Sequence, residues 1–306
     1  MLYILQRLDF FITDKISPRE VPNTMVAPIS IEDRDRANQH LDRSISFSMC
    51  GKIEQAIDEI KKAISIDSEF AQAHNKLGDY YMKKGLVKEA AAAYTRSLEL
   101  DPSNQNSNFD LGCSLAHLGR HEEALGYLRK ALDLKPTHTE IYGHIGRIMM
   151  MRGELEGAIS NLETALAANS DDIMSSFTLA CAYHMMGNSD KATRLFNKVI
   201  ERYKELTNIK KRFAEGHYYI GRSYFFMGNL AEAVKYLEKA VEYDTEDVDY
   251  HYSFGMLYSD ADAFCSLAEV QHALGNYSEA RENLDKAIKL NPDNPHFSKI
   301  KSQLGI

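Results

Sequence analysis

The sequence is poor in the residues that build disulfide frameworks and cysteine-rich metal modules. Its 306 residues contain no tryptophan and only four cysteines, and no two cysteines form a C-x-x-C pair. This excludes a small disulfide-stapled fold and a zinc ribbon. Isolated cysteines are typical of proteins in a reducing compartment. The four are Cys50, Cys113, Cys181 and Cys265.

Long apolar runs are also missing. No stretch is long enough to span a bilayer. The apolar start, MLYILQRLDFFI, has no basic leading region and is interrupted by Gln6, Arg7 and Asp9. It therefore does not have the pattern of a secretory signal. Together with the cysteine usage, this predicts a cytoplasmic protein.

The chain has no excess of positive charge. Lysine and arginine number 36 against 44 aspartates and glutamates, which gives a formal net charge of -8. Non-specific nucleic-acid binding needs basic patches, so we expect no nucleic-acid partner. The one dense basic run, Lys210-Lys211-Arg212, is interpreted as a solvated loop rather than a phosphate site.

Catalytic and cofactor motifs are absent as well. The sequence contains no glycine-rich phosphate loop, no HExxH and no GxSxG, so we expect no catalytic residue and no cofactor. Cys113 and His117, and likewise Cys181 and His184, are spaced to share a helix face. Such pairs can bind a metal or activate a thiol. A zinc site usually needs four ligands, so we interpret these as buried cysteines beside surface histidines, with no metal.

What the chain does contain is a repeated pattern. In its clearest copy, Leu77-Gly78 is followed by Tyr81, Gly85, Ala90 and Tyr94. The first four copies step by 34 residues, and the next two steps are 41 and 47 residues. A period of this length is typical of stacked helical hairpins. The copies are centred on Gly78, Gly112, Gly146, Ala180, Gly221 and Ala268.

Each repeated position has a physical reason. The apolar residues fall at helical spacing, so each half of a copy is predicted to be an amphipathic helix. The central glycine or alanine permits two helices to approach closely. The second glycine can adopt the left-handed conformation that ends a helix. The residue equivalent to Tyr94 in each copy, a tyrosine, phenylalanine or leucine, fills the space between hairpins.

This pattern resembles the tetratricopeptide repeat (TPR) family, whose signature is W-x₂-L-G-x₂-Y…A-x₃-F…P over 34 residues. The resemblance extends from about Gln39 to Pro292. The chain departs from the signature in lacking the tryptophan, and the closing proline is missing after three copies. The resemblance implies an all-α fold, a right-handed superhelical solenoid of antiparallel helix pairs. We expect about seven units, near 37–70, 71–104, 105–138, 139–172, 173–213, 214–246 and 261–294, with a capping helix at 293–306.

Three segments depart from the repeat. Residues 1–36 are predicted to be an arm and linker, either a frayed end or a short helix that covers Leu41, Ile45 and Met49, in the same chain or a partner subunit. The step of 41 residues is expected to lengthen one helix through Glu201 to Leu206. Residues 247–260 are interpreted as an irregular segment, either a loop insertion or a first helix without its second.

In the TPR family, the first helix of each unit lines a concave groove. Carried onto this chain, the resemblance implies a groove with apolar, adaptable residues and two arginines. Such a wall suits a peptide with apolar anchors and an acidic group. The alternative is that some of these residues are core. The expected wall residues are Phe109, Arg147, Met150, Met151, Phe177, His184, Met185, Tyr218, Arg222, Phe225 and Phe226.

The predicted function is a non-catalytic scaffold that binds a protein segment in its groove. Family members that grip chaperone tails use a set of Lys, Asn and Arg that Asn75, Asp79 and Asp110 do not supply. Two alternatives stay open. One is the regulatory or docking part of an enzyme of glycosyltransferase or sulfotransferase type, with which the abrupt start and unfinished tail are compatible. The other is a scaffold that self-associates through its N-terminal arm.

Overall fold

The computed structural model describes residues 29–210, 212–243, 259–292 and 295–305, and in these ranges it contains fifteen α-helices and no strand. Residues 1–28 of the predicted arm and linker (1–36) and most of the irregular segment lie outside the described residues. The helices are α1 (Ile31–Met49), α2 (Ile53–Ile66), α3 (Ala71–Lys83), α4 (Val87–Leu100), α5 (Gln105–His117), α6 (His121–Leu134), α7 (Glu140–Met151), α8 (Leu155–Ala168), α9 (Ile173–Met185), α10 (Ser189–Ile209), α11 (Ala214–Phe226), α12 (Leu230–Glu242), α13 (Asp260–Ala273), α14 (Tyr277–Leu290) and α15 (Pro295–Leu304).

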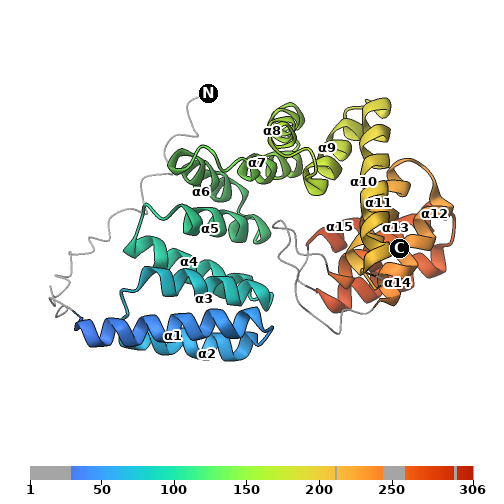
Figure 1. Cartoon of the computed structure of the whole chain (residues 1–306). Helices are drawn as coiled ribbons and strands as arrows, with labels where there is room; N and C mark the ends of the chain where they lie inside the picture. The colour runs from blue at the N-terminus through green and yellow to red at the C-terminus, as the bar shows by residue number, and fades with distance from the viewer. Residues whose placement is uncertain (1–28, 211, 244–258, 293–294, 306) are drawn as a thin grey trace, which may run out of the picture.

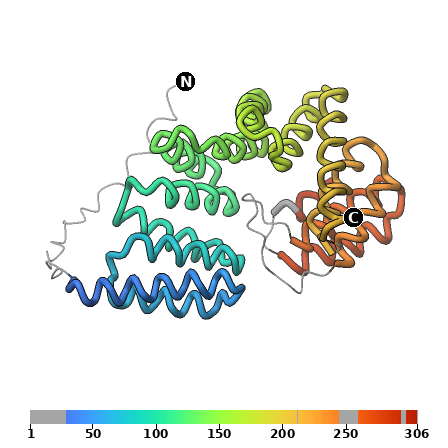
Figure 2. The backbone as a smooth tube through the Cα atoms, in the orientation of Figure 1, coloured from blue at the N-terminus to red at the C-terminus, as the bar shows by residue number. Residues whose placement is uncertain are grey.

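The helices are arranged as a stack of pairs. Each odd-numbered helix from α1 to α13 packs against the helix that follows it, and the second helix of each pair contacts the first helix of the next. The stack bends into an arch, with α1–α4 forming one arm, α7 and α8 the top, and α11–α15 the other arm (Figures 1 and 2). This confirms the prediction of an all-α solenoid of helix pairs.

The turn inside each pair is closed by a glycine in the left-handed region. At Gly85, φ is 71°, and its backbone N–H donates to the carbonyl of Met82 at 2.9 Å. The next amide, that of Leu86, donates to the carbonyl of Tyr81 at 2.9 Å. These two bonds satisfy carbonyls that the end of a helix leaves without partners. A short turn of this kind sends the second helix back along the first.

The central glycine of a pair marks a close approach between helices. A Cβ placed on Gly146 of α7 would lie 2.6 Å from Cγ of Leu162 and 3.0 Å from the carbonyl oxygen of Ala158, both on α8. Leu162 and Ala158 are fully buried. The missing side chain therefore lets α8 settle against α7 with its leucine inserted over the glycine.

The core is distributed along the stack. The buried residues form separate clusters, each made by helices that are neighbours along the stack, and no cluster gathers all described helices around one centre. At the far end of the stack, Phe297 and Ile300 of α15 are buried with Leu284 of α14. A last helix that covers the apolar side of the final pair protects a repeat stack from water.

Two of the irregularities can be compared with the structure. α10 is 21 residues long and runs to Ile209, which confirms that the extra residues lengthen this helix. The strip Leu41, Ile45 and Met49 is not uniformly exposed. Leu41 belongs to the core between α1, α2 and α3, whereas Met49 is 83% exposed. The expectation of an exposed strip was wrong for Leu41, because this side of α1 packs against α2, its partner in the pair, and against α3. The residue limits of the seven repeat units remain predictions.

We predict opposite effects for two glycine-to-alanine substitutions in neighbouring pairs. Gly146→Ala should destabilise the protein by about 1–3 kcal/mol, because the added methyl group overlaps Leu162 and a backbone oxygen. Gly126→Ala in the middle of α6, where a Cβ meets nothing within 4 Å, should stabilise it by about 0.5–1 kcal/mol through helix propensity. Urea unfolding followed by circular dichroism measures both. Equal effects of the same sign would contradict the close-approach role.

Candidate functional site

The first helices of the pairs form the inner side of the arch. α5, α7, α9, α11 and α13 contact one another in succession, and Figure 1 shows α5 and α7 toward the inside with α6 and α8 outside. We call this surface, from α5 to α13, the inner wall. The residues expected on it from the sequence lie on these helices, so their exposure and contacts show what the wall can bind.

The expected wall residues fall into three groups by exposure. Phe177 is 9% exposed and packs in the core, where its ring lies 5.1 Å from Tyr219. Met151 and Met185 are 61% and 59% exposed. His184 is also exposed. The half-buried members are Phe109, Arg147, Met150, Tyr218, Arg222, Phe225 and Phe226.

Arg222 on α11 is already paired with a carboxylate of the same chain. Its Nη1 lies 2.5 Å from Oε2 of Glu269 on α13, and neither side chain is more than 20% exposed. The guanidinium also lies 4.8 Å from the ring centre of Phe226 and 5.7 Å from that of Phe225. Burial, the largest single effect, lowers the pKa of Arg222, but the Glu269 carboxylate together with Tyr218 and Cys181 outweighs it, so the pKa is raised. Arg222 is therefore held charged and oriented toward a carboxylate.

Arg147 on α7 lies in a different setting. Its Nη2 donates to Nδ1 of His144 at 2.9 Å, since arginine cannot accept. Burial, followed by the charge of Arg147, lowers the pKa of His144 well below its ordinary value. The imidazole is consequently neutral. Phe109 of α5 packs edge-on against it at 4.9 Å, so arginine, histidine and phenylalanine form one group that joins α5 to α7.

The cysteines near the wall are not reactive thiols. Cys113 Sγ lies 3.3 Å from Nδ1 of His144, whereas His117 bonds the backbone oxygen of Cys113 at 2.8 Å. Burial raises the pKa of Cys113 far above its ordinary value and that of Cys181 to about 12. Within the described residues, no three His, Cys, Asp or Glu side chains are placed to hold a metal ion. From the sequence we paired Cys113 with His117. The contact with His144 was missed because Cys113 and His144 lie 31 residues apart in the chain.

The end of the stack before the inner wall is polar. Asn75 of α3 donates from Nδ2 to Ser107 Oγ and to Asp110 Oδ2, both at 3.1 Å and both on α5. Tyr94 donates to Asp79 at 3.0 Å, and Asp79 also pairs with Lys76 at 2.8 Å. These groups satisfy one another across α3, α4 and α5. The exposed methionines of the inner wall, Met151 and Met185, lie beyond this polar end, on α7 and α9.

One buried carboxyl lies at the start of α11. Glu215 is 9% exposed. Burial raises the pKa of Glu215 from 4.5 to about 7, and nearby Lys210 lowers it only in part. An acid whose pKa is higher in the folded state stabilises the fold at low pH, and this contribution is lost as the pH rises from 4.5 through 7.

None of the described helices is long and apolar enough to cross a membrane.

Glu215→Gln should raise stability at high pH and leave it nearly unchanged at low pH. At about pH 8 the wild-type carboxylate is ionised in a buried position, which costs on the order of 3 kcal/mol for a shift of this size. The amide removes that cost. Melting temperatures from circular dichroism near pH 5 and pH 8 test this, with exposed Glu238→Gln on α12 as the control. An equal gain at both pH values, or an effect of the control, would argue against the burial cost.

Family models match most of the chain. Models described as tetratricopeptide repeat match residues 75–139, 115–174, 175–205, 214–247 and 261–294, and one described as TPR repeat matches residues 49–85. Together they extend over the seven helix pairs except nearly all of the first helix, α1, and the end of α10 after residue 205.

Two relatives share parts of the sequence. A small glutamine-rich tetratricopeptide repeat-containing protein of Mycosarcoma maydis is 40% identical over 63 residues, 21% of this chain and 18% of that protein. A TPR repeat-containing protein of Methanocaldococcus jannaschii is 28% identical over 159 residues, 49% of this chain and 25% of that protein. The chain thus spans a quarter or less of the length of these curated relatives.

Solved structures share the fold. A tetratricopeptide repeat protein from Parabacteroides merdae aligns with a TM-score of 0.63 at 18% identity, over 89% of this chain and 100% of that one. Cut9–Hcn1, an APC/C hetero-tetramer, aligns with a TM-score of 0.60 at 16% identity, over 89% of this chain and 53% of the matched one. At these identities the similarity shows the architecture alone.

Proposed function

Because the chain belongs to the tetratricopeptide repeat family, we propose that it is a non-catalytic scaffold that binds a segment of a partner protein on its inner wall. Repeats of this family form protein-interaction scaffolds, since a stack that buries its apolar faces only between neighbours leaves one long surface for a partner. The bound segment would carry apolar anchors and at least one carboxylate.

The observation that carries this proposal is the combination of exposed methionines and oriented arginines on the inner wall. Met151 and Met185 stand at equivalent places of successive repeats, the last residues of α7 and α9, and both are more than half exposed. Methionine is flexible and polarisable, so it adapts to varied apolar side chains. Exposed apolar groups in register on adjacent helices are typical of a binding surface.

The pair between Arg222 and Glu269 supports the acidic part of the proposal. It is held 2.5 Å apart in a half-buried setting, so the guanidinium is already oriented for a carboxylate. A partner's carboxylate could replace that of Glu269 without reorienting Arg222. Such an exchange avoids leaving the arginine buried without a partner, which costs several kcal/mol. Peptide binding would then loosen the contact between α11 and α13.

We predict that acidic peptides with apolar anchors bind through Arg147 and Arg222. Peptides selected from a displayed random library on the immobilised chain should be enriched in these two features. Arg147→Gln combined with Arg222→Gln should weaken their binding about tenfold or more, because a charge-assisted hydrogen bond contributes about 1.5–3 kcal/mol. Isothermal titration calorimetry measures the affinity.

The control is Arg129→Gln on the exposed side of α6, outside the inner wall. It removes one positive charge by the same substitution, against two in the double variant, and should leave the affinity within about twofold of wild type, as expected for a distant surface charge. Circular dichroism confirms that the double variant is folded. Equal binding by the double variant and the wild-type chain, or an equal loss in Arg129→Gln, would refute the assignment of the arginines.

A further inference from the structure

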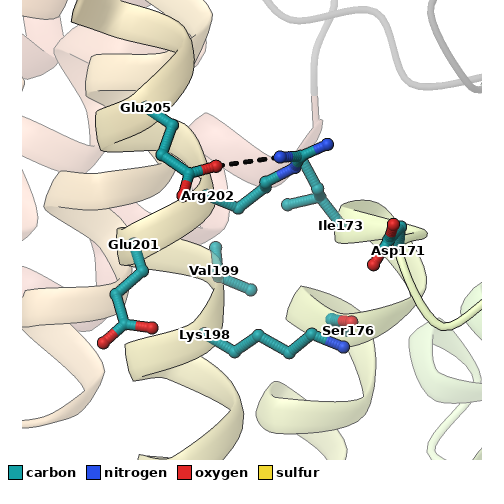
Figure 3. A pocket seen from close by; sticks show the side chains of 8 residues that line it. All are labelled: Asp171, Ile173, Ser176, Lys198, Val199, Glu201, Arg202 and Glu205. Atoms are coloured by element: carbon teal, nitrogen blue, oxygen red, sulfur yellow. Dashed lines mark hydrogen bonds and ion pairs between the residues drawn. The ribbon is translucent and has the colours of Figure 1, made fainter.

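A hollow of about 180 Å³ lies between α9 and α10, apart from the exposed methionines of the inner wall (Figure 3). Ile173 and Ser176 of α9 line one side, and Val199 and Arg202 of α10 line the other. A cavity of about 150 Å³ is large enough to hold benzene. The hollow therefore has room for one aromatic ring.

Two departures from the repeat meet at this hollow. Ser176 stands four residues before the central Ala180, and larger residues occupy that place in the other copies. α10 is 21 residues long, whereas the second helices of the other pairs have 13 or 14 residues. A small side chain beside a lengthened helix leaves the space unfilled. The larger residues are His74, Asn108, Tyr142, His217 and Phe264.

The next repeat shows what fits this place. Forty-one residues further on, Ser176 corresponds to His217 and Arg202 corresponds to Tyr243. The ring of His217 lies 5.2 Å from the ring of Tyr243 and 5.8 Å from that of Tyr236. In that repeat a ring on the first helix thus packs against the end of the second. At Ser176 the corresponding ring is missing.

The charges around the hollow do not favour an anion. Lys198 donates from Nζ to the carbonyl oxygen of Ser170 at 2.6 Å. Arg202 pairs with Glu205 at 2.8 Å, the dashed line in Figure 3. Three carboxylates, those of Asp171, Glu201 and Glu205, line the same hollow. The basic groups are therefore balanced, and a neutral ring suits the site better than a phosphate. The plane of Arg202 can stack on such a ring.

One polar group in the hollow has an unmet hydrogen bond. Ser176 is 2% exposed, and its Oγ has no hydrogen-bond partner among the described residues. Leaving a buried hydroxyl unsatisfied costs about 1–3 kcal/mol. An indole N–H or a phenol O–H at the edge of a bound ring would satisfy it. This favours tryptophan or tyrosine over phenylalanine.

From these observations we propose that the hollow beside Ser176 is a docking socket for a tryptophan or tyrosine side chain of a partner protein. The ring lies between Ile173 and Val199 and stacks on Arg202, and its polar edge bonds Ser176. This socket goes beyond the inner wall, because it lies between the two helices of one pair. A partner that uses both surfaces is held at two points, which increases its affinity.

The test uses 3-methylindole and N-acetyl-tryptophanamide as probes of the side chain. The chain has no tryptophan, so indole fluorescence reports only the probe. We expect both probes to bind saturably and to shift the methyl NMR signals of Ile173 and Val199. Ser176→Tyr, which fills the hollow, should lower the affinity at least about tenfold. Asn197→Tyr on the exposed side of α10 should not change it.

Further measurements separate the alternatives. Ser176→Ala keeps the hollow and removes the hydroxyl, so it should weaken 3-methylindole binding several-fold and leave toluene binding unchanged. The combined Arg147→Gln and Arg222→Gln variant should bind the probes as wild type does, whether or not the inner wall binds peptides. Binding of the free ring without binding of N-acetyl-tryptophanamide would overturn the proposed protein source. Absence of saturable binding, or unshifted Ile173 and Val199 methyl signals, would overturn the socket itself.

Discussion

The structure depends on one contact that recurs along the chain, the close approach of two helices over a residue without a side chain or with only a methyl group. At Gly78 the ring of Tyr94 occupies the space that a Cβ would need, and at Gly146 and Gly221 a leucine does so. Each contact brings a first and a second helix together, and the exposed apolar side of that pair is then buried by the next pair. Burial along a line, rather than around a centre, produces the arch.

This arrangement also explains why the inner wall holds charged residues that are half buried. A residue on a first helix faces the first helices before and after it, so its neighbours come from other repeats. Arg222 pairs with Glu269 of the following described pair, and His144 contacts Cys113 of the preceding one. Arg222 is thereby shielded from most of the water while part of its side chain stays exposed, whereas His144 and Cys113 are buried. In the proposed function, the side chains that join neighbouring first helices are also the ones that bind the partner.

The unusual features of the molecule lie where the chain departs from the repeat. The insertion that lengthens α10 is followed by the buried Glu215, whose pKa is raised by burial. The same helix, together with the small Ser176, encloses the hollow. A regular repeat fills each such space with its own side chain, and a lengthened helix beside a small residue does not. Irregular places in repeat proteins are therefore where new contacts with partners can arise.

The sequence by itself determined the period, the helix pairs, the positive-φ glycine turns such as Gly85, the glycine of the close approach and the longer helix before Ile209. These follow from residues near one another in the chain, whose spacing sets helix faces and turns. Only the tertiary structure decided that Phe177 is core, that Arg222 forms an ion pair with Glu269 and that the place beside Ser176 is hollow. Those outcomes depend on the distance and rotation between successive repeats. Packing of complete side chains sets both, and a pattern of residue types does not record them.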